Sequence, residues 1–353
     1  MNIAKTLLGA AIMIAAPAVM GCDIAHAHGR STAESPIAQE AIVVDTPFVH
    51  DPVMAYENGI YYLYCTGRGI TQMTSTDRQH WTLSQEGVLP DSKIPVWTHD
   101  SVPGFEHHIW APDVIKYKNK WYLAYSCSTF GKNASAIGLL SNKKLSDKNG
   151  WKEEGCIVAS KGGRDTWNAI DPNFVIDEKG KPWMTWGSFW DGIQLIPLDK
   201  TMHPKKDAKP VTIARRYSPE RSDVPSNPTS KEAGTNAIEA PFIMRHGGYY
   251  YLFVSWDYCC QGMKSTYRVA VGRSKQVAGP YLDKEGKPMH QGGGTLLLEG
   301  DKREYEAMGH CSAYSFADGD YFFCHGYSVA KNGASILVQK RIRWTNDGWL
   351  TLE

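Results

Sequence analysis

The sequence predicts an all-β protein, a five-bladed β-propeller with a pocket on its axis. The first observation is a repeat that begins at four prolines spaced 60, 60 and 69 residues apart: Pro52, Pro112, Pro172 and Pro241. The second is that each copy holds short aromatic and β-branched runs split by turn pairs such as Asn58-Gly59. The third is that no long helical period interrupts these runs. Four antiparallel strands in each of about five units describe a propeller.

The first two strands of every predicted blade follow one pattern, which is an apolar run, a polar turn and an aromatic-rich run. The copies cover 51–64, 111–125, 171–186, 240–252 and, more loosely, 309–324. A third strand of small and apolar residues is predicted at 136–140 and 269–272. Trp81 and Trp151 mark strands at the outer edges of their blades.

Length and charge are consistent with one propeller domain over 42–353. The 353 residues exceed what one ordinary core serves, and radial repetition accounts for them without a second domain. The formal net charge is +1, so charge gives no reason to expect nucleic acid or an anionic membrane surface as a partner. We expect a monomer.

The N-terminus is predicted to be a signal peptide over 1–27, followed by a polar tether over 28–41. Lys5 gives the positive flank and residues 6–20 the short apolar stretch. The run 19–22 resembles a lipobox, which would leave Cys22 lipidated, whereas 25–27 resembles an ordinary cleavage site. We therefore expect export, either to the cell envelope through a lipid anchor or as a periplasmic or secreted protein.

Apart from Cys22 the chain has seven cysteines, and their spacing indicates neither a dense disulfide framework nor zinc. The adjacent pair Cys259-Cys260 leaves two alternatives open. The pair either closes a vicinal disulfide in a loop or consists of two small buried thiols.

Three carboxylates open repeated units in similar frames. The frames are His50-Asp51-Pro52, Ile170-Asp171-Pro172 and Ile238-Glu239-Ala240-Pro241. Because the first residues of radially arranged units point to one axis, the three acids are expected in one pocket. Converging carboxylates are what hydrolysis of a glycosidic bond requires. The alternative is that they are turn-capping or surface residues.

Six motifs in order, at blade spacing, carry a family resemblance. They are 50–52, 108–113, 135–138, 168–172, 186–189 and 238–241. Together they resemble glycoside hydrolase family 43, most closely its endo-α-1,5-L-arabinanases, over nearly all of 42–353. The resemblance implies an inverting enzyme that cuts internal bonds of arabinan. An exo-acting α-L-arabinofuranosidase or β-xylosidase of the same family, and a non-catalytic surface glycan-binding propeller, stay open as alternatives.

The resemblance also implies roles for the acids. Asp51 would be the general base, Glu239 the general acid, and Asp171 a third carboxylate that orients the sugar and raises the pKa of the acid by like-charge repulsion. An inverting pair is held roughly 6.5 to 9.5 Å apart, which leaves space for a water.

Further site residues follow less directly. Trp110 and Phe130 resemble sugar-stacking residues, and Asn168 and Ser188 are expected to bind a sugar hydroxyl or a carboxylate. Core packing or turn capping is the alternative for each. The resemblance implies a metal ion at the propeller centre, commonly calcium, held by a histidine and largely by waters. His310 takes that place, although calcium prefers oxygen ligands and a buried, hydrogen-bonded histidine is the alternative.

Overall fold

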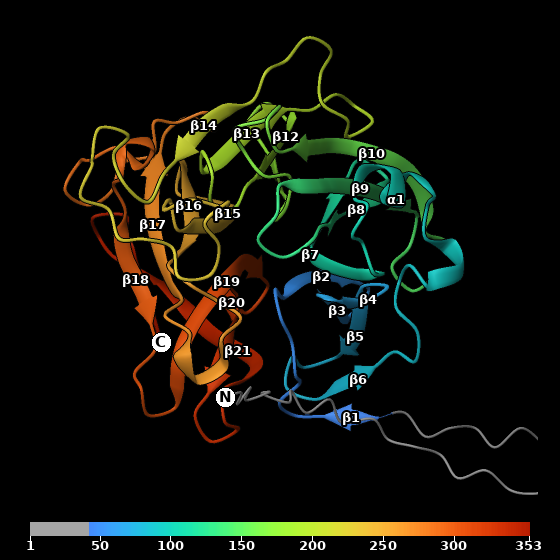
Figure 1. The fold of residues 1–353 in the computed structure, drawn as a ribbon. Coiled ribbons are helices and arrows are strands. Elements are labelled where there is room, and N and C mark those ends of the chain that lie inside the picture. Colours follow the sequence, from blue (N-terminus) through green and yellow to red (C-terminus); the bar gives the residue numbers. More distant parts are fainter. Residues whose placement is uncertain (1–41) are drawn as a thin grey trace, which may run out of the picture. The chain divides into compact units, whose positions relative to one another are not determined.

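The computed structural model describes residues 42–353, which form five antiparallel sheets that follow one another around a common axis (Figure 1). The predicted five-bladed propeller is confirmed. The predicted signal peptide, the candidate lipidation site Cys22 and the tether over 28–41 lie outside the described residues. Within the described part, no helix is long and apolar enough to cross a membrane.

The strands of each blade follow one another outward from the axis. The first blade holds β2 (Val53–Glu57), β3 (Ile60–Cys65), β5 (Thr71–Ser75) and β6 (Trp81–Leu83), with β1 (Val43–Val44) at its outer edge. The second holds β7 (His108–Tyr117), β8 (Lys120–Cys127), β9 (Ala134–Asn142) and β10 (Lys152–Lys161), with β4 (Gly67–Arg68) added beside β7. The third holds β11 (Asn173–Ile176), β12 (Pro182–Trp186), β13 (Ile193–Pro197) and β14 (Val211–Ala214).

The last two blades complete the ring. The fourth holds β15 (Ile238–His246), β16 (Tyr249–Trp256), β17 (Arg268–Ser274) and β18 (Thr295–Glu299). The fifth holds β19 (Tyr305–Phe316), β20 (Gly319–Ser328), β21 (Ala334–Trp344) and β22 (Leu350–Leu352). Short helices lie in the connections: η1 (Asp91–Lys93), α1 (Trp97–Ser101), η2 (Gly262–Lys264) and η3 (Met289–Gln291).

A left-handed residue stands within the innermost strand of each blade or two positions before it. These residues have φ between 40° and 58°, although none is glycine: Asp51, Ala111, Asp171, Ala240 and His310. In β7, β15 and β19 the register shifts at this point, as in a β-bulge. Bulges re-aim side chains and are common beside active sites. The left-handed conformation costs an ordinary residue roughly 1–2 kcal/mol, so surrounding contacts must hold it.

Those contacts cross from blade to blade. The backbone N–H of the left-handed residue donates to a polar side chain on, or just after, the second strand of the preceding blade. The pairs are Asp51 with His325 Nδ1, Ala111 with Thr66 Oγ1, Asp171 with Ser126 Oγ, and His310 with Ser255 Oγ, at 2.8–3.1 Å. In the third blade the matching position, Gly187, has no side chain. The N–H of Ala240 instead donates to Asp171 Oδ2, at 3.1 Å.

The same arrangement closes the ring and encloses the core. Ser312 Oγ donates to the carbonyl of Pro52 at 2.8 Å, which joins the fifth blade to the first. Apolar side chains pack between neighbouring sheets. One cluster includes the fully buried Tyr64 and Leu123, and in another the rings of Phe253 and Phe322 lie 5.9 Å apart. The walls of the axial pocket are therefore held by packed sheets on all sides.

Candidate active site

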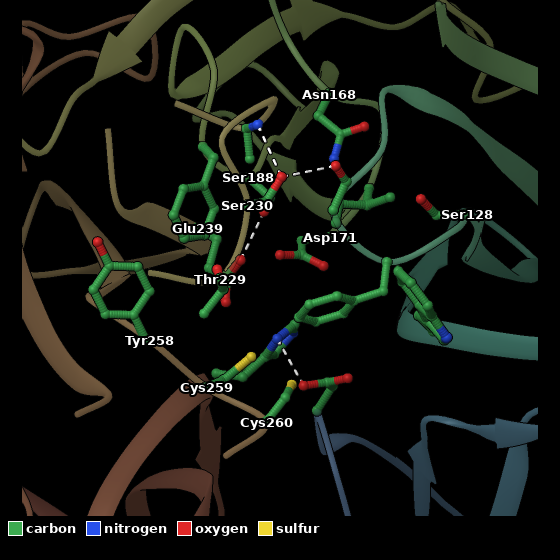
Figure 2. A pocket seen from close by; sticks show the side chains of 18 of the residues that line it. Ser128, Asn168, Asp171, Ser188, Thr229, Ser230, Glu239, Tyr258, Cys259 and Cys260 are labelled. Atoms are coloured by element: carbon green, nitrogen blue, oxygen red, sulfur yellow. Dashed lines mark hydrogen bonds and ion pairs between the residues drawn. The ribbon is translucent and has the colours of Figure 1, made fainter. Parts of the chain in front are cut away.

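Side chains from all five blades line a pocket of about 550 Å³ at the axis. Asp51, Asp171 and Glu239 all face this pocket and are 6–8% exposed (Figure 2 shows Asp171 and Glu239 within it). The structure thus brings the three predicted acids together from three blades. The expected subsite residues Trp110, Phe130, Asn168 and Ser188, and also His310, line the same pocket: all of the residues predicted for the site meet there.

Asp51 is the most heavily hydrogen-bonded of the acids. Its Oδ1 lies 2.9 Å from both His50 Nδ1 and His310 Nδ1, and its Oδ2 accepts from Thr66 Oγ1 at 2.5 Å. Burial acts to raise the pKa of Asp51, but the charges and hydrogen bonds of His310 and His50 outweigh it and hold the pKa well below its usual value. A carboxylate has about four lone-pair sites, and three are taken. About one remains for a water.

Glu239 lies one position before the left-handed residue of its blade, whereas Asp51 and Asp171 occupy that position themselves. The three frames are therefore not equivalent, and Glu239 corresponds to His50 in the first blade. Ser188 Oγ donates to Glu239 Oε2 at 2.6 Å, and the two residues form a β-bridge. This contact fixes one carboxylate oxygen and leaves the other for a ligand.

The pKa of Asp171 is raised because the three acids lie close together in a buried site. Burial raises the pKa of Asp171 first, and the charges of Glu239 and Asp51 raise it further, against His310, so it lies well above its usual value. The Ala240 N–H holds Oδ2 on the side of the fourth blade. Gly187 has no side chain that could accept the Ala240 N–H, so Asp171 accepts it instead. Because Ala240 directly follows Glu239, this hydrogen bond holds Asp171 near Glu239.

The subsite residues have distinct surroundings. Phe130 is 59% exposed in the loop between β8 and β9, which suits stacking on a sugar ring. Trp110 is half-buried on β7, with Nε1 donating to His108 Nδ1 at 3.1 Å. Asn168 is buried, and its Oδ1 accepts from Ser135 Oγ at 2.7 Å. Within residues 42–353 its amide nitrogen has no hydrogen-bond partner, so that nitrogen is the atom left for a ligand.

Sequence reasoning assigned no role to the residues that support Asp51. His50 belongs to a motif that gives it no role of its own, and Thr66, His325 and Tyr327 lie outside the motifs. Burial and the charge of His50 lower the pKa of His325 well below its usual value, so a neutral imidazole accepts the Asp51 N–H. The sequence does contain a signal for these residues. A polar residue recurs on, or just after, the second strand of four blades: Thr66, Ser126, Ser255 and His325.

His310 has the geometry of a metal-binding histidine. Its Nδ1 lies against the Asp51 carboxylate, and within the described residues its Nε2 has no hydrogen-bond partner. A histidine that donates Nδ1–H to a carboxylate offers Nε2 to a metal, which would take the place of the second ring proton. His50, Asp51 and His325 also form a close group, but His325 Nδ1 is used by the Asp51 N–H. His310 therefore fits a metal ion whose other ligands are waters.

Carboxylates that face one another across a pocket are the catalytic groups of glycoside hydrolases, and this pocket holds three of them. Residues 41–350 match the family model "Glycosyl hydrolases family 43", and the chain belongs to this family. It is 44% identical to the extracellular exo-α-(1→5)-L-arabinofuranosidase of Cellvibrio japonicus, over 85% of each chain. It is 39% identical to the extracellular endo-α-(1→5)-L-arabinanase 1 of Bacillus subtilis, over 85% of this chain and 86% of that one.

A solved structure is similar throughout the domain. The exo-1,5-α-L-arabinanase from a bovine ruminal metagenomic library matches with a TM-score of 0.80 and 51% identity. The match covers 89% of this chain and 98% of that one. The expected family is confirmed, and its relatives include both exo- and endo-acting enzymes.

Proposed function

We propose that this chain hydrolyses the α-1,5 bonds of arabinan with inversion at the anomeric carbon. The observation that carries the proposal is the pairing in one pocket of an ionised, hydrogen-bonded Asp51 with Glu239, whose second oxygen is left for a ligand. The similar proteins from Cellvibrio and Bacillus support arabinan as the substrate, because their names state α-(1→5)-arabinan chemistry. Their description as extracellular supports export.

The geometry divides the work between the acids. Asp51 holds a water through its remaining lone pair and takes its proton as the water attacks the anomeric carbon. Glu239 gives a proton to the leaving oxygen on the opposite side of the sugar. Asp171, held by the Ala240 N–H, orients the sugar.

A non-catalytic glycan-binding propeller accounts poorly for this pocket. Burying three carboxylates together is costly, and here it is offset by two imidazoles, two hydroxyls and a backbone N–H. A binding site needs stacking aromatics such as Phe130, but it gains nothing from such a cluster.

The position of cleavage along the chain is the finer question. The motif resemblance to endo-arabinanases favours internal cleavage. One specific observation favours a second candidate, attack at a chain end. The long connection at 215–237 carries Ser230 and Glu232 across to the loop of Phe130: Ser230 Oγ donates to the Gly131 carbonyl at 3.0 Å, and Glu232 pairs with Lys132 at 2.9 Å. We call these contacts the loop bridge. It joins two segments that line the same pocket, and we propose that it closes the pocket on that side.

Digestion of linear arabinan, followed by proton NMR and product sizing, tests the proposal. Early products should carry the anomer opposite to the substrate, and retention would contradict the role of Asp51. Attack at a chain end gives one short product from the start, whereas internal cleavage gives a ladder of products of many lengths.

If the loop bridge closes the pocket, Glu232→Ala should shift the products toward this ladder. Glu220→Ala, an exposed residue of the same connection, is the matched control.

We further propose that His310 binds a divalent metal, with calcium expected, that supports catalysis without taking part in proton transfer. When bound, the ion offsets repulsion among the three carboxylates. His310→Ala should lower turnover by about tenfold or more, because Asp51 also loses a hydrogen-bond partner, while circular dichroism stays nearly unchanged. His80→Ala, at an exposed histidine, is the control. Elemental analysis that finds no metal in fully active protein would overturn the proposal.

A further inference from the structure

Two adjacent cysteines form part of the wall of the substrate pocket. Cys259 and Cys260 lie in the loop between β16 and β17 and line the pocket with Asp171 and Glu239 (Figure 2). Both are free thiols, and Cys260 is exposed while Cys259 is half-buried. The structure therefore contains neither the vicinal disulfide nor the pair of buried thiols that the sequence left open.

A histidine lies beside Cys260 and can hold the thiol proton as an imidazolium ion. Cys260 Sγ lies 3.8 Å from His50 Nε2, and His50 Nδ1 lies 2.9 Å from Asp51 Oδ1. Nucleophile, base and orienting carboxylate follow one another in the order that activates cysteines in enzymes. Burial acts to lower the pKa of His50, but the charge and hydrogen bond of Asp51 outweigh it and raise the pKa well above its usual value.

The backbone holds Cys260 in this position. Its N–H donates to the hydroxyl of Tyr327 at 2.7 Å, and that hydroxyl lies 3.0 Å from His50 Nε2. Cys260 has φ 65°, a left-handed conformation that the tyrosine contact helps to hold. The thiol therefore stays beside the imidazole instead of pointing freely into solvent.

The two thiols differ in the way that thiol–disulfide exchange requires. The hydrogen bond from Cys259 lowers the pKa of Cys260 to about 6, with His50 adding to the effect against burial. The same hydrogen bond, together with burial, raises the pKa of Cys259 well above its usual value. Cys260, which also lies beside His50, is therefore the thiol better suited to attack a disulfide, and Cys259 is placed next to it to resolve a mixed disulfide.

We propose that Cys259 and Cys260 form a thiol–disulfide exchange site, open to small disulfides, whose oxidation shuts down the active site. Cys260 passes its proton to His50 Nε2, and the thiolate attacks one sulfur of a disulfide RSSR, which forms Cys260–S–S–R and releases RS⁻. Cys259 then loses its proton and attacks Cys260 Sγ, which forms the Cys259–Cys260 disulfide and releases a second RS⁻. The pair is oxidised by two electrons, RSSR is reduced to two thiols, and the two protons accompany them.

Both products should interfere with hydrolysis, an effect that rests on the proposed function. A group R on Cys260 occupies the pocket where the sugar binds. The disulfide between the neighbours draws Cys260 Sγ toward Cys259 and removes the sulfur that faces His50, the partner of Asp51. We expect at least about a tenfold loss of activity, in the range that follows when a residue supporting a catalytic group is lost.

The test treats the full chain with oxidised glutathione and follows each cysteine by peptide mass spectrometry and activity on arabinan. Wild-type protein should lose two hydrogens at Cys259–Cys260, Cys259→Ser should stop at a glutathionylated Cys260, and Cys260→Ser should keep its own starting activity after treatment. Dithiothreitol should restore activity, and an arabino-oligosaccharide should slow the reaction.

Cys156 serves as the internal control, because the residue is also exposed but lies on β10 outside the pocket. Partial desolvation of its sulfur raises its pKa to about 11. Modification of Cys156 as fast as Cys260 would overturn the proposal. So would a fully oxidised pair in protein that keeps its activity. The mass readout needs no substrate, so a failure here is distinguishable from a wrong assignment of arabinan.

Discussion

Asp51→Asn is expected to lower turnover of arabinan by about 10²- to 10⁴-fold, because the water loses the group that takes its proton. Asparagine keeps the shape, but its NH₂ group must face donors from His50, His310 or Thr66. One buried donor then lacks an acceptor, which costs about 1–3 kcal/mol of stability. Turnover should therefore fall by orders of magnitude, whereas the unfolding temperature should fall only slightly. Steady-state kinetics and thermal unfolding on one preparation measure both.

The loss should not depend on the leaving group. An aryl arabino-oligoside with a good leaving group still needs a water activated by Asp51, so the variant should be equally poor on this substrate and on arabinan. Asp45→Asn, at a side chain that is 80% exposed, is the matched control and should behave as wild type. Asp51→Asn that is folded and keeps more than about a tenth of wild-type turnover would exclude Asp51 as the base.

Glu239→Gln is expected to lower turnover of arabinan by a similar factor, about 10²- to 10⁴-fold, for a different reason. The leaving sugar oxygen needs a proton, and glutamine has none to give. Glutamine can still accept the hydrogen bond of Ser188 through its carbonyl, so the local structure should persist. Kinetics on arabinan together with circular dichroism test this directly.

The leaving group separates this variant from the first. A nitrophenolate departs without protonation, so Glu239→Gln should recover much of its activity on a nitrophenyl arabino-oligoside, whereas Asp51→Asn should not. Glu285→Gln, at an exposed position, is the control. Equal losses of Glu239→Gln on both substrates would assign Glu239 a structural role instead of acid catalysis.

Local pattern was enough to predict the fold class and the three acids. The spacing of Pro52, Pro112, Pro172 and Pro241, the turn pairs and the alternation of aromatic strands are all short-range features. Each repeat must bury its faces against its neighbours, so radial stacking follows from the repeat itself. The first residues of the blades then have only one place to meet. Asp51, Asp171 and Glu239 could therefore be assigned to one pocket before any contact was known.

Other predictions needed contacts that the pattern does not contain. The frames of Asp51 and Glu239 look alike in sequence, yet the left-handed residue is Asp51 in one and Ala240 in the other. Gly187 has no side chain to accept the Ala240 N–H. Asp171 accepts it instead, and this hydrogen bond exists only because the third and fourth blades pack together. Such a pairing depends on where a hydrogen-bond donor lacks a partner, and that is known only when neighbouring blades are packed.

The sequence by itself determined a five-bladed propeller with a three-carboxylate pocket, because periodicity, turn chemistry and residue type act within a single blade. The resemblance of its motifs added family 43. The tertiary structure decided what surrounds those carboxylates. His50 lies 210 positions from Cys260, and Asp51 lies 274 from His325, yet each pair is in contact. No local propensity couples residues so distant. Closure of the ring brings the last blades against the first, and the unmet backbone N–H groups and carboxylate lone pairs at that junction select their partners.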